Sequence, residues 1–110
     1  MASDFYEQVF EIARMVPKGR VTSYGAIAKS LGVAKSSRLV GYAMNFSHQA
    51  VLLVPAHRVV NSKGLLTGKF HFETENTMQE QLEAEGVKVI DNKVQDFKNI
   101  FWDPILEINL

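Results

Sequence analysis

The segment VTSYGAIAKSLGVAKSSRLVGYAM, residues 21–44, contains the signals for two short helices joined by a tight turn. Ser23 stands where it can cap the first helix, and Ser36 or Ser37 can cap the second. The connecting residues 32–34 begin with a glycine, which is a common helix stop. An ordinary antiparallel helix pair is the commoner outcome of such a pattern, but the shape also fits a helix-turn-helix.

The distribution of charge favours the helix-turn-helix. No Asp or Glu occurs between Ile12 and Phe72, although the chain has 12 acidic residues. Chance segregation is the alternative, but a polyanionic partner explains a stretch of this length better, and nucleic acid is the commonest one. The flanks, with three lysines and 12 acids, carry a charge of −9, and the stretch itself carries nine cations: Arg14, Lys18, Arg20, Lys29, Lys35, Arg38, Arg58, Lys63 and Lys69.

The start of the second helix is the expected point of contact with DNA. In a helix-turn-helix the N-terminal residues of this helix lie nearest the groove. Here they are Lys35, Ser36, Ser37 and Arg38. The serines and the helix N-terminus can hold phosphates, which leaves Arg38 to reach inward.

The flanking segments predict further short elements. Apolar residues recur at helical spacing from Phe5 to Val16, and the run 51–54 reads as a buried strand or an extended segment that Pro55 ends. Thr77 and Glu80 form the pattern of a capping box. Residues 87–94 suggest a hairpin, residues 21–22 a short extended piece, and the aromatic tail 97–104 a segment that packs back. We expect residues 1–110 to form a single domain, mainly α with short strands, of the helix-turn-helix or winged-helix-like DNA-binding class.

The segment PAHRVVNSKG, residues 55–64, carries the most specific signal. It resembles the Pro-Cys-His-Arg-Val active-site motif of the O6-alkylguanine-DNA alkyltransferases, with Ala56 at the position of the alkyl-accepting cysteine. Residues 21–28, 38–44 and 81–87 also resemble segments of that family, in the same order and spacing. The chain contains no cysteine and is similar to the alkyltransferase-like proteins, short relatives that lack the nucleophile.

The resemblance implies roles at the DNA. Tyr24 matches the tyrosine that rotates the phosphate beside the target nucleotide, and Arg38 matches the arginine finger that fills the gap left by the flipped base. The recognition helix of the family enters the minor groove, where a small residue such as Gly41 suits close approach. Lys63 is expected to contact the DNA backbone. Either Asn45 or Ser47 stands near the family's hinge asparagine, and the residues alone do not choose between them.

The resemblance also implies a pocket for the flipped base. We expect a cation, Lys69, either at the O6/N7 edge of the base or on a phosphate. Replacing a thiol by the methyl group of Ala56 leaves room for substituents larger than methyl. The expected walls are Tyr24, Val54, Pro55, Ala56, His57, Arg58 and the loop from Leu65 to Lys69.

Alkyl transfer to this chain is not expected. The thiolate is the nucleophile in that reaction, and Ala56 offers none. The resemblance places Gln79 or Glu80 near the family's carboxylate, so the relay through His57 is expected to be incomplete as well. No local acid orients His57 as a base for hydrolysis. His48, His57 and His71 are spaced irregularly for a metal site, and no cofactor is expected.

The sequence therefore predicts a non-enzymatic sensor that flips O6-alkylguanine in double-stranded DNA and hands the lesion to nucleotide excision repair proteins. A sequence-specific regulator and a DNA enzyme using His57 are the alternatives. No signal peptide or membrane span is recognisable, so we expect a cytoplasmic monomer that associates with the nucleoid through DNA.

Overall fold

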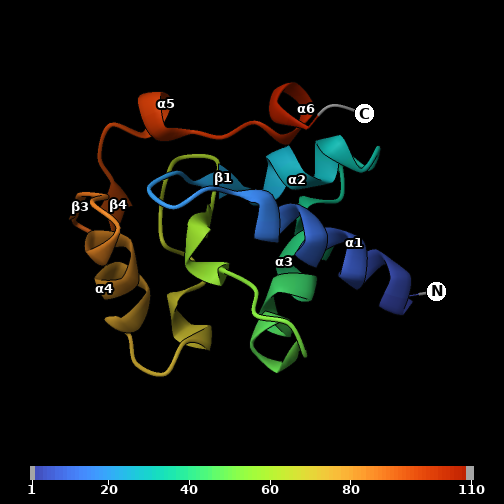
Figure 1. Ribbon diagram of the computed structural model, residues 1–110, viewed down its shortest axis with the longest axis horizontal. Helices are drawn as coiled ribbons and strands as arrows, with labels where there is room; N and C mark the ends of the chain where they lie inside the picture. The colour runs from blue at the N-terminus through green and yellow to red at the C-terminus, as the bar shows by residue number, and fades with distance from the viewer. Residues whose placement is uncertain (1, 109–110) are drawn as a thin grey trace.

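The helix-turn-helix expected between residues 21 and 44 is present in the computed structural model, which describes residues 2–108 (Figure 1). Strand β1, Thr22–Ser23, leads directly into helix α2, Tyr24–Ser30, and helix α3 spans Ser37–Asn45. The Ser23 hydroxyl accepts a hydrogen bond from the backbone N–H of Ala26 at 3.1 Å, which confirms the predicted cap. Ser36 is the N-cap residue of α3, but its side chain makes no capping hydrogen bond.

Helix α1, Ala2–Met15, covers the helix-turn-helix on its inner side. Its buried residues Val9 and Ala13 join Ile27, Val40 and other apolar side chains in one core cluster. The 14 residues of α1 cannot span a bilayer, and none of the helices within residues 2–108 is long and apolar enough to do so.

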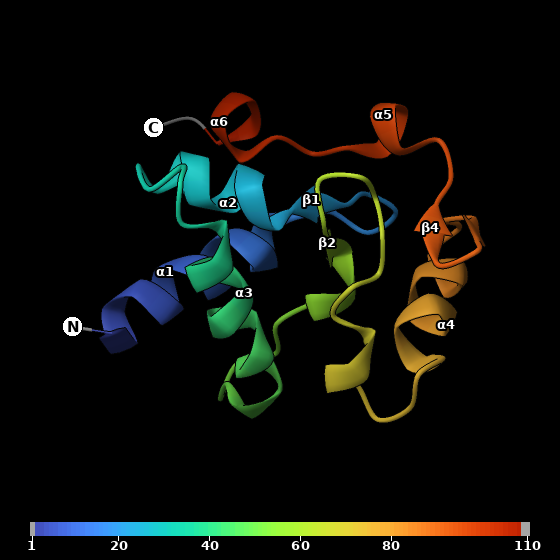
Figure 2. The same ribbon diagram turned by 180° about the vertical axis from the view of Figure 1, so that it is seen from behind.

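The C-terminal tail packs back onto the domain, as its aromatic residues predicted. It contains two short helices that were not predicted, α5, Phe97–Ile100, and α6, Pro104–Glu107. Figures 1 and 2 show the tail crossing beside α2 from one end of the molecule to the other. The backbone of Val21 bonds with both Ile100 and Trp102, and the indole of Trp102 is buried in the core.

A short parallel ladder brings the 55–64 motif next to the helix-turn-helix. Strand β2, Val59–Val60, pairs with β1 in the register Thr22–Val59 and Ser23–Val60 (Figure 2). The 3-10 helix η2, Ala56–Arg58, immediately precedes β2. Ala56 therefore lies close to the start of α2, although more than 30 residues separate the two in sequence.

A second apolar cluster forms around Leu66, Met78 and Leu82, and Val21 of the first half also belongs to it. The remaining elements are the 3-10 helices η1, Ser47–Gln49, and η3, Lys69–His71, then helix α4, Thr77–Ala84, and strands β3, Val89–Ile90, and β4, Lys93–Val94. The two strands form the predicted antiparallel hairpin, with Asp91 and Asn92 at positive φ in its turn.

Two local predictions are wrong. Of the two readings of residues 51–54, the buried strand is wrong, because Val51, Leu52 and Leu53 are exposed and only Val54 is buried. The guanidinium of Arg14 donates to the carbonyls of Leu52 and Leu53, at 3.1 and 3.3 Å, in place of a strand partner.

The capping box at Thr77 and Glu80 does not form either. Asn76 is the N-cap residue of α4, and its side chain makes no capping hydrogen bond. The Thr77 hydroxyl instead accepts from the backbone N–H of Thr74 at 3.1 Å, because the preceding turn folds back against the helix start.

Candidate nucleic-acid interface and pocket

An open groove of about 730 Å³ runs between α3 and the loop that follows β2. It brings together four of the predicted DNA-binding residues: Tyr24, Ser37, Arg38 and Gly41. It also contains Asn45, which is one of the two hinge candidates, and Thr67 and Gly68, which belong to the loop 65–69 expected at the pocket. Sequence reasoning did not select the remaining lining residues, Tyr42, Asn61 and His71. Of these groove residues, Asn61, Thr67 and Gly68 lie in the loop between β2 and η3.

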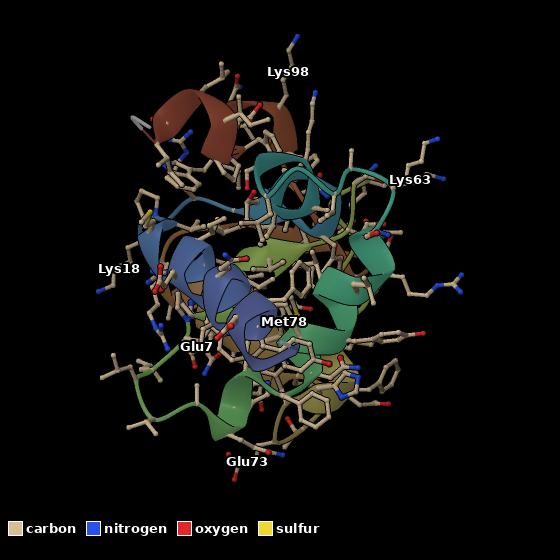
Figure 3. The ribbon with its side chains drawn as sticks, turned by 90° about the vertical axis from the view of Figure 1, so that its right-hand side faces the viewer. Glu7, Lys18, Lys63, Glu73, Met78 and Lys98 are labelled. Atoms are coloured by element: carbon tan, nitrogen blue, oxygen red, sulfur yellow. The ribbon has the colours of Figure 1, made fainter. Side chains whose placement is uncertain are left out.

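The remaining predicted contacts surround the groove without lining it. Lys35 and Ser36 precede α3, and Lys35 is exposed. The side chain of Lys63 extends into solvent on the side of α3, whereas Lys18 extends on the opposite side (Figure 3). The cations of the acid-free stretch are therefore not all on one face.

Arg38 differs from the other three arginines. Arg14 donates to the loop carbonyls of residues 52 and 53, Arg20 to the carbonyls of Ile100 and Phe101, and Arg58 to the carboxylate of Glu85. Arg38 is exposed at the start of α3 and has no such partner among residues 2–108. Its guanidinium is the one that the fold leaves available at the groove.

Tyr24 is anchored against the loop on the other wall of the groove. Burial raises the pKa of its hydroxyl, and a hydrogen bond with the side chain of Thr67 acts in the opposite direction. A Cβ atom on Gly68 would lie only 2.8 Å from the Tyr24 hydroxyl oxygen. A side chain at position 68 would therefore force the Tyr24 hydroxyl or the loop to shift, and glycine allows their close approach.

The prediction that His57 lacks a carboxylate partner is wrong. His57 Nε2 lies 2.9 Å from Oε2 of Glu85. The Arg58 guanidinium donates to both oxygens of the same carboxylate, from Nε to Oε1 at 3.0 Å and from Nη2 to Oε2 at 2.6 Å. Glu85 follows the last turn of α4, so neither Gln79 nor Glu80 supplies the acid. The turn at Gly19 contributes a further N–H donor at 3.4 Å.

These contacts determine the protonation of the pair. Burial alone would raise the pKa of Glu85, but the hydrogen bonds from Arg58 and His57 lower it to about 2. Burial, with the charge of Arg58, lowers the pKa of His57 against the raising effect of Glu85, and because the net shift is downward the imidazole is neutral at pH 7. An ionised carboxylate can only accept, so the single ring proton lies on Nε2 and Nδ1 is an acceptor.

A second cavity, of about 680 Å³, adjoins the motif on the side of Arg14 and α4. Its lining includes five of the residues predicted for the lesion pocket: Val54, Pro55, Ala56, His57 and Arg58. A narrow neck of about 10 Å³ shares lining residues with both this cavity and the groove, and Tyr24 and Ala56 are among the residues that line it.

Leu65 and Lys69 line neither the groove nor the neck nor the cavity. Leu65 forms a β-bridge with Lys93, which draws its backbone toward the hairpin. The ammonium group of Lys69 lies 5.2 Å from the centre of the Phe70 ring. Both side chains therefore stand apart from the residues that the structure gathers around Ala56.

The two residues proposed for the hinge have different surroundings. Asn45 is the last residue of α3 and lines both the groove and the neck. Ser47 is buried, and its hydroxyl donates to the carbonyl of Met44 at 2.6 Å. Within residues 2–108, no three His, Asp or Glu side chains gather in a cluster that could hold a metal ion.

Comparison with known proteins agrees with this arrangement. Residues 4–87 match the family described as 6-O-methylguanine DNA methyltransferase, DNA binding domain. Alkyltransferase-like protein 1 of Schizosaccharomyces pombe is 32% identical, over 92% of this chain and 96% of its own. The DNA base-flipping protein of Vibrio parahaemolyticus is 33% identical, over 91% of this chain and 97% of its own.

A solved structure shows the same fold. The S. pombe protein Atl1, in complex with damaged DNA containing O6-carboxymethylguanine, superposes with a TM-score of 0.80 at 31% identity. The match covers 93% of this chain and 97% of that one. The chain therefore belongs to the 6-O-methylguanine DNA methyltransferase DNA-binding-domain family, as an alkyltransferase-like member with Ala56 at the position of the nucleophilic cysteine.

Proposed function

We propose that the chain is a non-enzymatic sensor of O6-alkylguanine, which it flips out of double-stranded DNA and holds without removing the alkyl group. The observation that carries the proposal is the setting of Ala56. The histidine and carboxylate beside it are intact, the pocket adjoins it, and only the thiol is missing. A chain with this arrangement can receive the lesion but cannot form a thioether with it.

Binding begins at the groove beside α3. Ser36, Ser37 and the start of the helix offer hydrogen-bond donors to phosphates, and Lys35 and Lys63 add charge around the groove. These contacts carry no sequence information, which suits a protein that must examine DNA of any sequence.

Flipping then depends on Arg38 and Tyr24. Extruding a base requires a few kcal/mol of unstacking, and least for a damaged or mispaired one. A free guanidinium at the start of α3 can occupy the vacated space and hold the duplex open. Tyr24, fixed by Thr67 and Gly68 at the opposite wall, is placed to hold the turned phosphate beside the extruded nucleotide. Because Gly41 has no side chain, the backbone in the middle of α3 can approach the minor groove of the DNA closely.

The flipped base would lie in the groove beside Tyr24, with its O6 substituent directed into the neck toward Ala56. Lys69 lies outside the three cavities, so a phosphate contact suits it better than the O6/N7 edge of the base. Because the alkyl group remains on the base, the complex itself is the signal. We propose that it recruits nucleotide excision repair proteins, in the cytoplasm where the chromosome is accessible.

The proposal is tested by a gel-shift titration with two matched duplexes, one with O6-methylguanine and one with guanine. The recovered DNA is then analysed for the methyl group by mass spectrometry. Tighter binding of the lesion duplex with the methyl group intact is the expected result. Equal binding would leave a general helix-turn-helix DNA-binding protein, and loss of the methyl group would contradict the non-enzymatic assignment.

A further inference from the structure

The groove, the neck and the cavity form a series through the protein. The neck shares Tyr24, Asn45, Gly68 and His71 with the groove, and His48, Ala56 and Phe72 with the cavity. The groove and the cavity have no lining residue in common. The neck therefore borders both spaces and gives a substituent that enters from the groove a direct path to the cavity.

Two aromatic rings stand at the cavity end of this neck. The rings of His48 and Phe72 meet edge to face, with centroids 4.7 Å apart and an interplanar angle of 76°. His48 belongs to η1 and Phe72 follows η3, so two separate segments supply the pair. Both side chains line the neck and the cavity together with Ala56, whose methyl group is too small to close the passage.

The volume of the neck determines what fits while the rings stay in contact. About 10 Å³ is close to the least space that holds one water molecule, so it can take a group of methyl size and nothing longer. The cavity beyond is far larger, at about 680 Å³. A longer substituent has ample space there, provided that the rings separate.

We propose that the ring pair of His48 and Phe72 determines which O6 substituents the chain accepts. A methyl group stays in the neck, and a longer substituent passes between the rings into the cavity. The inference rests on the proposed function, because it concerns the same flipped base. His48 is the more mobile partner, since it is exposed, whereas Phe72 packs against both core clusters.

The cavity indicates the class of longer substituent. Leu53, Val54 and Pro55 give one apolar side, whereas Arg14, His57 and Gln81 supply polar groups. A lining of this kind suits a substituent with an apolar stem or ring that can end in a hydrogen-bonding group. Its charged groups are balanced, with two arginines against Glu73 and Glu85, so no net charge on the substituent is required.

The test measures dissociation constants by fluorescence anisotropy for duplexes with guanine, O6-methylguanine and O6-benzylguanine. The variants are His48→Ala and Phe72→Leu, with Phe70→Ala as a matched control, because Phe70 is an exposed aromatic ring that lines neither the neck nor the cavity. Thermal unfolding of each variant separates loss of folding from loss of binding. His48→Ala keeps the test decisive if Phe72→Leu proves unstable, because the exposed ring contributes little to the core.

We expect His48→Ala and Phe72→Leu each to tighten binding of the O6-benzylguanine duplex about tenfold or more relative to the O6-methylguanine duplex, because each removes a steric block. Phe70→Ala should leave that ratio within about twofold of the wild type. A ratio that is unchanged in His48→Ala and Phe72→Leu, while the wild type still prefers O6-methylguanine to guanine, would overturn only the proposed role of the ring pair. If the wild type shows no preference for O6-methylguanine, the proposed function is contradicted, and the role of the ring pair with it.

Discussion

Nε2 of His57 donates to Oε2 of Glu85 across 2.9 Å, although 28 residues separate the two in sequence. The pair is partly buried beside Ala56, and Arg58 and the turn at Gly19 hold the carboxylate from two further directions. A base oriented by a carboxylate is what a nucleophilic thiol requires, and it remains here without the thiol. The pair therefore serves as a structural tie between the motif, the end of α4 and the turn after α1.

The first prediction follows from that intact pair. Ala56→Cys should give the chain a single-turnover alkyltransferase activity, because Nδ1 of neutral His57 can accept the thiol proton and the thiolate can then attack the methyl carbon. The measurement is mass spectrometry of the protein after incubation with O6-methylguanine duplex, where one added methyl group is expected.

Ala56→Ser is the matched control, since a hydroxyl is a far weaker nucleophile at neutral pH. Adding Glu85→Gln to Ala56→Cys should slow the transfer by about 100-fold, the usual contribution of a positioned base. An Ala56→Cys protein that binds the lesion but never gains the methyl group would show that the geometry around position 56 no longer suits transfer.

A second prediction concerns stability and pH. The folded pKa of Glu85, about 2, lies below its ordinary value of 4.5, so the carboxylate stabilises the fold fully above pH 4.5. That contribution is lost as the pH falls toward 2. Glu85→Gln should reduce the free energy of unfolding by about 3 kcal/mol at pH 7, and the difference from the wild type should shrink by pH 3.

Urea unfolding at the two pH values checks this, with Glu83→Gln as the control. Glu83 lies on the same helix but is exposed, and its carboxylate contacts only Gln79 among the interactions described. A pH-independent effect of Glu85→Gln would mean that lost packing, rather than the charged contacts, accounts for the change.

The third prediction uses the close approach of Gly68 to Tyr24. A methyl group at position 68 would lie 2.8 Å from the tyrosine hydroxyl, so Gly68→Ala should destabilise the fold by about 1–3 kcal/mol. In a Tyr24→Phe background the clashing oxygen is absent, and the same substitution should have a much smaller effect. A double-mutant cycle by thermal unfolding measures this coupling.

Gly25→Ala serves as the control, because no atom lies within 4 Å of the added Cβ and the residue is helical. It should leave stability unchanged or raise it slightly. Additive effects of Gly68→Ala and Tyr24→Phe would place the loop farther from the tyrosine than the structure does.

Local signals predicted the helix-turn-helix well, because a cap such as Ser23 acts within one turn of its own helix. The partner of His57 could not be predicted in that way. Glu85 lies beyond Phe72, where acids are common, and only the packing of α4 brings it to the motif. The apolar run at 51–53 wrongly suggested a buried strand for a related reason. Its carbonyls accept hydrogen bonds from Arg14, a residue of α1 that is distant in sequence.

Charge counting predicted the DNA-binding class but not which cations face the groove. Arg14, Arg20 and Arg58 stabilise the fold through contacts with backbone and carboxylate oxygens. The acceptors of these three arginines are carbonyls and one distant acid, which charge counting does not detect. Arg38 was named from its position at the start of the second helix and from the resemblance to a family, and the structure shows that it has no such acceptor among residues 2–108.

A fourth prediction follows from the position of Lys63. Its side chain extends on the side of α3, so Lys63→Ala should weaken binding to lesion and plain duplexes alike and reduce the salt slope by about one. Lys18→Ala is the control, since Lys18 extends on the opposite side. Titrations at several salt concentrations measure the slope, and equal effects of the two variants would place the DNA elsewhere.

The last prediction separates holding a flipped base from holding DNA. Arg38→Ala should reduce the preference for O6-methylguanine over guanine by about tenfold, with a smaller loss of affinity for the plain duplex. The reason is that an intercalated guanidinium acts only in the flipped complex, whereas a phosphate contact acts in both. Lys35→Ala provides the comparison, because a contact at the mouth of the groove should weaken the two complexes equally. Anisotropy titrations of both duplexes give the two ratios, and Arg38→Ala losing affinity equally for each would reduce Arg38 to a phosphate clamp.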